Sequence, residues 1–269
     1  MFAISLSLWA VRYFHFNNEL MVSEPISVLQ FITLNSAILL ISAGGYWINN
    51  FYDYEIDKIN KPHQKQLLEV FSKKHIISTY ILMNGLGLIL SGLLGVKNFI
   101  VNAICILLLW VYAAYWKRKI FIGNATIAIL SVLVIFVAEW NLNNWAFINK
   151  DLLYYASFCF LVTWAREVVK DIEDLEGDTI MGCSSLPIRF GTSFSKWVIQ
   201  TFNLLIFISL MLYFIEVSNI KKLFLSFFIM LPTILVSSKL YWATQKKDYR
   251  MISHWYKYIF FAGIFSLLI

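Results

Sequence analysis

The chain has 269 residues, of which 59% are hydrophobic and only 14% are charged, and its mean hydropathy is +0.69. A soluble domain would carry roughly 25% charged residues, so a water-soluble fold is excluded and the lipid bilayer must solvate most of the chain. The formal net charge of +6 does not indicate a nucleic-acid partner. The basic residues lie in short connections between apolar segments and not on one soluble face.

Long apolar runs dominate the sequence. A helix needs about 20 residues to cross ~30 Å of hydrocarbon. Nine runs of near that length follow one another, at 2–17, 27–48, 76–96, 98–116, 121–140, 152–169, 197–217, 222–242 and 252–269. They are continuously apolar, whereas the strands of a membrane barrel alternate. The sequence predicts an all-α integral membrane protein, with a single domain over residues 1–269 and about nine transmembrane helices.

The basic residues are concentrated in alternate connections. Those at 49–75, 117–120, 170–196 and 243–251 carry fourteen lysines and arginines, and the other connections carry four. Positive charge is retained on the cytoplasmic side of membranes. We therefore expect the first set to face the cytoplasm, in the cell inner membrane. The sequence does not define an oligomeric state.

The first acidic cluster follows the second apolar run. Asn49, Asp53 and Asp57 are spaced i, i+4, i+8, which places them on one face of a helix. Two carboxylates so close together raise each other's pKa unless a cation neutralises them. Oxygen ligands of this kind suit Mg²⁺ that is bound together with substrate phosphates.

A second acidic cluster follows the sixth apolar run, where Asp171, Asp174 and Asp178 are spaced i, i+3, i+7 and Lys170 borders them. A solvated, salt-bridged helix end is the alternative interpretation of either cluster. Two such clusters on the same side of the membrane, each at the exit of a span, favour a site.

Between the two clusters lies an aromatic and basic segment, Tyr112 to Lys119. An aromatic belt followed by cytoplasmic anchoring charges is one interpretation. Beside two metal-binding clusters, Lys117 and Arg118 become candidates to bind the remaining oxygens of an anion.

Three segments carry a resemblance to a known family. NNFYDYEIDKINKP (49–62), YAAYWKRKIFIGN (112–124) and REVVKDIEDLEGDTIMGCSSLP (166–187) resemble the signature regions of the UbiA family of intramembrane prenyltransferases. The third segment is most similar to the branch that acts on geranylgeranylglycerol phosphate.

The resemblance implies a central cavity capped by two Asp-rich cytoplasmic loops, and Mg²⁺ held on a polyprenyl diphosphate. By the family pattern, one metal site consists of Asn49, Asp53 and Asp57, and the other of Asp171, Asp174 and Asp178. Lys117, Arg166 and Lys170 would contact the diphosphate, with Tyr112 near it. The catalytic candidates are Asp53, Asp57, Asp171, Asp174 and Lys117.

The implied reaction is Mg²⁺-dependent transfer of an isoprenyl group, which we expect to be geranylgeranyl, to a lipid-soluble acceptor. We expect a prenyl-glycerol phosphate, although Cys183-Ser184-Ser185 stands where the branch has basic residues. The phosphate of this acceptor would then be bound by Lys58, Lys61, Lys65 and Arg189. Transfer to a quinone or other aromatic precursor, and an acceptor-free terpene cyclase, remain alternatives. A transporter would carry polar residues at mid-membrane depth, whereas these acids lie at helix ends.

Overall fold

The structure, a computed structural model, describes residues 2–17, 27–62, 66–143 and 150–269, and every regular element in these ranges is helical. The elements are α1 (Phe2–Asn17), α2 (Val28–Tyr52), α3 (Tyr54–Asn60), α4 (Leu67–Val70), α5 (Lys73–Leu93), α6 (Val96–Ala114), η1 (Trp116–Arg118), α7 (Ile122–Asn143), α8 (Lys150–Glu173), α9 (Leu175–Ile180), α10 (Leu186–Phe214), α11 (Asn219–Leu225), η2 (Ser226–Met230), α12 (Leu231–Trp242) and α13 (Lys246–Ser266).

Seven segments of the described chain are long and apolar enough to cross a membrane. They are Val28–Tyr52, Lys73–Leu93, Val96–Ala114, Ile122–Leu142, Lys150–Glu173, Leu186–Phe214 and Asn219–Trp242. α1 contributes a shorter apolar helix, Ala3–Phe14. The chain is therefore an all-helical membrane protein, as the composition predicts.

Two of these spans are irregular. The last of them joins α11, a π-helical turn (η2) and α12. The turn ends just before Pro232, which has no backbone N–H for a regular helical bond. α10 begins at Leu186, earlier than the predicted run 197–217, and its backbone leaves helical geometry at Gly191, where φ is 84°.

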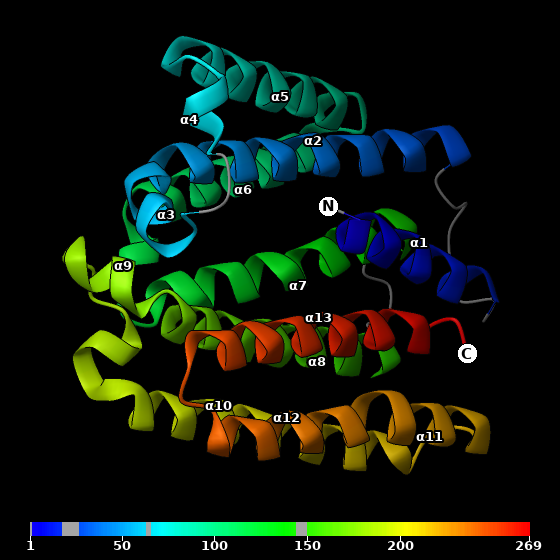
Figure 1. Cartoon of the computed structure of the whole chain (residues 1–269). Coiled ribbons are helices and arrows are strands. Elements are labelled where there is room, and N and C mark those ends of the chain that lie inside the picture. The colour runs from blue at the N-terminus through cyan, green and yellow to red at the C-terminus, as the bar shows by residue number, and fades with distance from the viewer. Residues whose placement is uncertain (1, 18–26, 63–65, 144–149) are drawn as a thin grey trace.

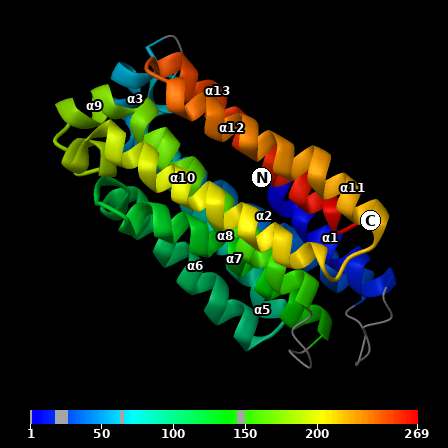
Figure 2. The same ribbon diagram turned by 90° about the horizontal axis from the view of Figure 1, so that it is seen from below.

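The long helices run roughly along one direction, so the bundle has two distinct ends (Figure 1). The short helices α3 and α9 lie together at one end, while α11 and the C-terminus lie at the other, and the view from below agrees (Figure 2). The segments that follow α2 and α8 in the sequence thus meet at the same end of the molecule.

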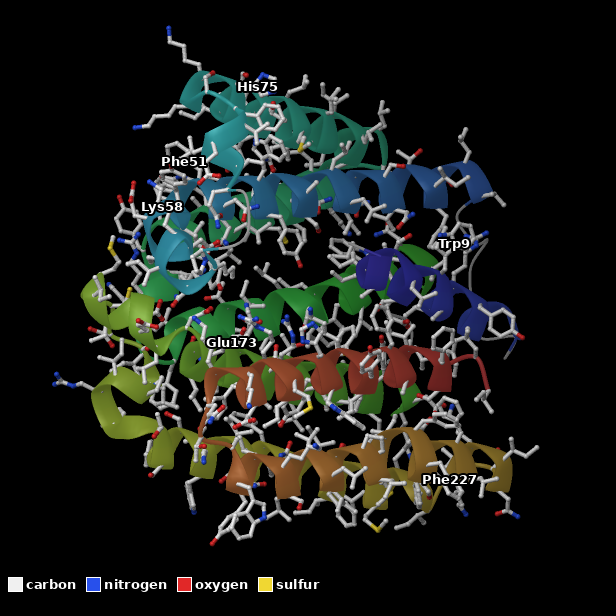
Figure 3. All side chains as sticks on the ribbon, in the orientation of Figure 1. Trp9, Phe51, Lys58, His75, Glu173 and Phe227 are labelled. Atoms are coloured by element: carbon white, nitrogen blue, oxygen red, sulfur yellow. The ribbon has the colours of Figure 1, made fainter. Side chains whose placement is uncertain are left out.

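α8 forms the centre of the core and packs against α7, α10 and α13. Its small and branched residues are fully buried, among them Cys159, Val162, Ala165 and Val168. Large apolar side chains instead cover the outside of the bundle, as Figure 3 shows for Phe227, which is 59% exposed. This arrangement fits a protein whose outer surface contacts lipid.

Candidate active site

The first acidic segment lies where α2 gives way to α3. Asp53 separates the two helices, with φ −84° and ψ −4°. Helical hydrogen bonding nevertheless continues, because the Asp53 N–H donates to the Asn49 carbonyl at 2.9 Å and the Asp57 N–H donates to the Asp53 carbonyl at 2.7 Å. Asn49, Asp53 and Asp57 therefore stay aligned across the break.

The two carboxylates of this segment are buried, Asp53 at 3% and Asp57 at 7% exposure. Asn49 Nδ2 donates to Asp53 Oδ2 at 2.6 Å, and Lys117 forms an ion pair with the same oxygen. Lys61 Nζ lies 2.9 Å from Asp57 Oδ1. A buried carboxylate is costly unless it is paired, and here each one has a lysine of its own.

The second acidic segment repeats this local design. α8 ends at Glu173, Asp174 lies between the helices with φ −94° and ψ 8°, and α9 follows. The Asp174 N–H donates to the Lys170 carbonyl at 2.8 Å, and the Asp178 N–H donates to the Asp174 carbonyl at 3.1 Å. In both halves, a span ends immediately before an aspartate and a short helix carries the next one.

The side chain of Asn60 joins the two short helices α3 and α9. Asn60 Nδ2 on α3 donates to the Asp174 carbonyl at 3.1 Å, and Asn60 Oδ1 accepts the Gly177 N–H of α9 at 3.0 Å. A Cβ on Gly177 would lie 2.6 Å from Asn60 Nδ2, so this approach requires glycine. The contact fixes the separation of the acidic segments.

The charges of the two segments act on each other. Burial raises the pKa of Asp178 to about 6, with Asp174 and Asp53 adding to the rise and Lys117 opposing it. Burial also raises the pKa of Asp174, against the opposing charge of Lys61. Acids from both segments therefore share one electrostatic environment.

Lys117 lies in η1, between the two acidic segments. Gly123 permits its position, because a Cβ there would lie 2.8 Å from the Trp116 carbonyl oxygen. Burial alone would lower the pKa of Lys117, but the neighbouring Asp53 and Tyr112 raise it well above the ordinary lysine value. Lys117 therefore remains an ammonium ion at neutral pH.

Arg118 has a different position from its neighbour. Its NH2 group donates to the Tyr52 carbonyl at 3.4 Å, and its own carbonyl accepts the Ser184 N–H at 2.9 Å. Arg118 thus connects α2, η1 and the segment before α10.

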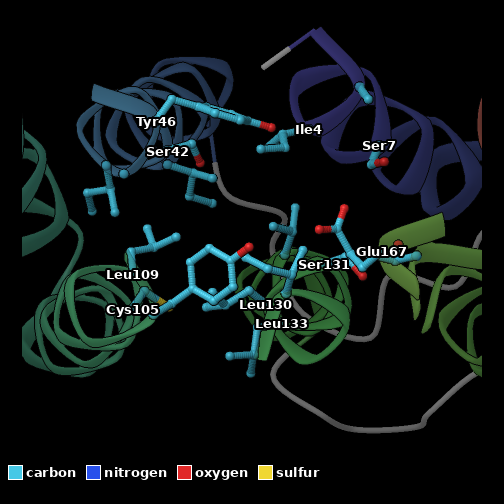
Figure 4. A pocket seen from close by; sticks show the side chains of 18 of the residues that line it. Ile4, Ser7, Ser42, Tyr46, Cys105, Leu109, Leu130, Ser131, Leu133 and Glu167 are labelled. Atoms are coloured by element: carbon cyan, nitrogen blue, oxygen red, sulfur yellow. The ribbon is translucent and has the colours of Figure 1, made fainter. Parts of the chain in front are cut away.

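A cavity of about 510 Å³ lies inside the bundle, lined by residues of α1, α2, α6, α7, α8 and α13. Most of its wall is apolar, and Figure 4 shows Leu109, Leu130 and Leu133 around it, together with Tyr46. The charged and polar lining residues include Asn49, Tyr112, Lys117, Arg166, Glu167, Lys170 and Lys257.

Glu167, which also lines the cavity, forms ion pairs with two cations. It is 5% exposed, Arg166 NH1 lies 2.9 Å from its Oε1, and Lys170 Nζ lies 3.0 Å from its Oε2. Figure 4 shows its carboxylate at the cavity, across from Tyr46 of α2 and beside Ser7 of α1. The cavity therefore combines a long apolar wall with a strongly polar wall.

Five of the predicted site residues line the cavity, namely Asn49, Tyr112, Lys117, Arg166 and Lys170. Seven do not, namely Asp53, Asp57, Lys61, Arg118, Asp171, Asp174 and Asp178, although ion pairs and neighbouring charges bring them close to the first group. Lys65 lies outside the described residues.

The oxygen donors of the site meet part of what Mg²⁺ requires. In the described ranges, no three His, Cys, Asp or Glu side chains converge closely enough to hold a metal by themselves. Asn49 Oδ1, however, is buried without a hydrogen-bond partner, and its residue lines the cavity beside Asp53. An unpartnered amide oxygen next to a carboxylate fits a hard cation whose remaining ligands come from phosphate.

Three residues of this region were not predicted from the sequence. Asn124 Nδ2 donates to Asp171 Oδ2 at 2.8 Å, Asn60 joins the short helices, and Glu167 pairs with two cations. Asn60 follows Asp57 by three residues, which is a helical spacing, and Asn124 ends the second quoted segment. Glu167 lies beside Arg166 and precedes Lys170 by three residues, which is also a helical spacing.

Fold and site together define a membrane protein that gathers carboxylates and cations at one end of an intramembrane cavity. The sequence profile described as the UbiA prenyltransferase family matches residues 20–264. The chain belongs to this family and is a prenyltransferase, as the three segments predict.

Two relatives are named digeranylgeranylglyceryl phosphate synthase. The one from Methanosphaera stadtmanae is 32% identical over 222 residues, which are 81% of this chain and 78% of the relative. The one from Pyrococcus horikoshii is 35% identical over 168 residues, or 62% of this chain and 59% of the relative. The chain thus matches about three fifths of the length of the second relative.

Solved structures share the fold. The apo structure of a UbiA homologue from Aeropyrum pernix K1 has a TM-score of 0.75 at 14% identity and covers 100% of this chain and 97% of that one. A UbiA homologue from Archaeoglobus fulgidus, bound to GPP and Mg²⁺, has a TM-score of 0.67 at 15% identity and covers 99% and 96%. The helical fold is therefore that of UbiA proteins.

Proposed function

We propose that this protein transfers a geranylgeranyl group from its diphosphate to the free hydroxyl of a prenyl-glycerol phosphate. The name of the relative that is 32% identical over most of both chains supports this donor and acceptor. One observation carries the proposal. The pair of Lys117 with the buried Asp53 carboxylate lies at the polar end of a cavity whose apolar wall would accommodate an isoprenyl chain.

The residues divide the work of the reaction. The bond between the allylic carbon and the diphosphate oxygen breaks, and the acceptor oxygen forms an ether bond to that carbon as its hydroxyl loses a proton. Diphosphate departs readily only where its growing negative charge is neutralised, a role for Lys117, Arg166 and Lys170. The apolar cavity excludes water, which would otherwise capture the carbocation, and Tyr112 lies at its polar end.

Mg²⁺ would supply the remaining neutralisation of the leaving diphosphate. Asn49, Asp53 and Asp57 would hold it at one segment, and Asp171, Asp174 and Asp178 at the other, as the donor chemistry of the unpartnered Asn49 oxygen supports. Since the described acids form no closed metal cluster, we assign the remaining ligands to diphosphate oxygens.

For the whole chain we propose one prenyltransferase domain over residues 1–269, with α1 and α13 completing nine transmembrane helices. The two Asp-bearing segments would cap the cavity on the cytoplasmic side of the cell inner membrane. The excess of basic residues in the connections at that end supports this orientation.

Purified protein incubated with geranylgeranyl diphosphate, geranylgeranylglyceryl phosphate and Mg²⁺ should form a doubly prenylated glycerol phosphate, identified by mass spectrometry. EDTA should abolish the product and added Mg²⁺ should restore it. Asp53→Asn and Asp171→Asn should each reduce turnover by at least about 100-fold, since each removes charge that compensates the transition state. Glu55→Gln, at an exposed acid two residues from Asp53, is the matched control.

Two other results would replace the proposal. Product formed only with an aromatic or quinone precursor would assign a different acceptor. A hydrocarbon or alcohol formed from the diphosphate alone would assign a terpene cyclase. Full activity of both aspartate variants would show that the acidic segments are salt-bridged helix ends without a role in the reaction.

A further inference from the structure

A lysine of α13 lines the cavity although none of the three motif segments contains it. Lys257 lies 11 residues after Lys246, the first residue of α13, and so roughly 16 Å along the helix from that end. Phe260 and Phe261 line the cavity beside it, at i+3 and i+4. One face of α13 therefore presents a single cation between the polar and the apolar parts of the wall.

Lys257 is exposed in the structure and lines the cavity, and an ionisable side chain that faces a cavity of a membrane bundle usually marks a functional site. The charged groups that act on Lys257 are Arg166, Lys170 and Glu173. Glu173 is already paired with Arg250, whose Nε lies 2.9 Å from its Oε1. In the described part of the chain, Lys257 has no ion pair of its own.

The charges around Lys257 leave a local excess of positive charge. Arg166 and Lys170 share one carboxylate, Glu167, so these two cations with Lys257 exceed it by two charges. Asp171, whose Oδ2 accepts from Asn124 of α7, also lies near Lys170 and reduces this excess to one charge. A phosphate monoester carries about −1.5 to −2 charges at pH 7, which suits such an excess.

The other cations considered for the acceptor are engaged elsewhere. Lys61 pairs with Asp57, and Lys58 lies 3.6 Å from Glu55. Arg189 is exposed, and neither it nor Lys58 nor Lys61 lines the cavity. The loop cations are thus poorly placed to bind a phosphate beside the apolar wall.

We propose that Lys257, with the excess charge of Arg166 and Lys170, binds the phosphate of the acceptor lipid and so selects a phosphorylated acceptor. The assignment rests on the proposed function and adds the position of the second substrate. The diphosphate is held near Lys117 and the acidic segments and the acceptor phosphate at Lys257 of α13, so that Arg166 and Lys170 contribute charge to both anions.

The test measures both Michaelis constants for Lys257→Gln, Lys257→Arg and the matched control Lys247→Gln, an exposed lysine on the same helix. Lys257→Gln should raise the KM for geranylgeranylglyceryl phosphate about tenfold or more, because one charge-assisted contact to phosphate is lost. The KM for geranylgeranyl diphosphate should change less than about twofold. Lys257→Arg should restore most of the affinity, and Lys247→Gln should match the wild type.

A binding measurement without donor separates this proposal from the proposed function. Calorimetry should show that the wild type prefers geranylgeranylglyceryl phosphate to the same lipid without its phosphate, and that Lys257→Gln loses this preference. Binding with this preference but without transfer would contradict the proposed function alone. Transfer with unchanged acceptor KM in Lys257→Gln, or a raised KM for the diphosphate instead, would overturn the role of Lys257. An unchanged KM for the diphosphate shows that the variant is folded.

Discussion

Asp178 combines burial with repulsion from neighbouring carboxylates. Burial, then the charges of Asp174 and Asp53, raise its pKa to about 6 in the metal-free protein. A carboxyl whose pKa is raised on folding binds more protons in the native than in the unfolded state at intermediate pH. The free energy of unfolding therefore falls as the pH rises from about 4 to about 6 and stays lower above that range. The same repulsion makes the site receptive to a cation.

Asp178→Asn removes this penalty. In EDTA at pH 7.5 the variant should unfold at a higher temperature than the wild type. Its free energy of unfolding should be larger by about 1–2 kcal/mol once partial exposure is considered, and this difference should shrink towards pH 4. Its activity should be lost. Thermal unfolding in detergent at both pH values measures the effect, with Glu176→Gln, at an exposed acid of the same helix, as the control. A destabilised variant at pH 7.5 would contradict the burial argument.

Among the elements, the pairing of α3 with α9 determines the geometry of the acidic segments. Each short helix is only six or seven residues long, too short to be stable by itself. The contact of Asn60 with Gly177 and the Asp174 carbonyl therefore stabilises both helices together. The two acidic segments are positioned as one unit.

Gly177→Ala should break this unit, because the added methyl group would overlap the Asn60 side chain. We expect a loss of about 1–3 kcal/mol in unfolding free energy, and a larger relative loss of activity than of folded protein. Gly85→Ala is the control, since a Cβ there meets nothing within 4 Å and alanine favours the helix. Equal stability and activity of the two variants would contradict the role of the contact.

At the scale of the whole molecule, both short helices lie at the end opposite α11 (Figure 2), so the bundle has one chemical end. From the distribution of basic residues we propose that this end faces the cytoplasm. Cys183, the natural probe in this region, is 7% exposed and is poorly suited to labelling. Exposed positions at both ends are available instead.

Ser184→Cys and Asn219→Cys, each made in a variant without Cys105, Cys159 and Cys183, report the orientation. Both positions are exposed, one after α9 and one at the start of α11. A membrane-impermeant maleimide should label position 184 only from the cytoplasmic side and position 219 only from the other side. The reverse pattern would invert the orientation, and labelling of both from one side would contradict the arrangement of the spans.

The sequence by itself determined that the lipid bilayer surrounds most of the chain and which acidic and basic side chains are candidates for its site. Continuous apolar runs can only be membrane helices, and the spacing of Asn49, Asp53 and Asp57 and of Asp171, Asp174 and Asp178 follows from local helical periodicity. The position of Lys117 between the two acidic segments could also be predicted from the sequence, because its motif follows an apolar run at the same end of the bundle.

Only the tertiary structure decided which partners meet. The pairing of Lys117 with Asp53 and the joining of α3 to α9 by Asn60 depend on contacts between segments far apart in the chain. Lys257 is the clearest case, because a lone lysine in an apolar stretch has no pattern around it. Its meaning comes from helix packing, which turns its face of α13 towards the cavity beside Arg166 and Lys170. Periodicity is a local property, whereas the field at a buried charge is set by everything packed around it.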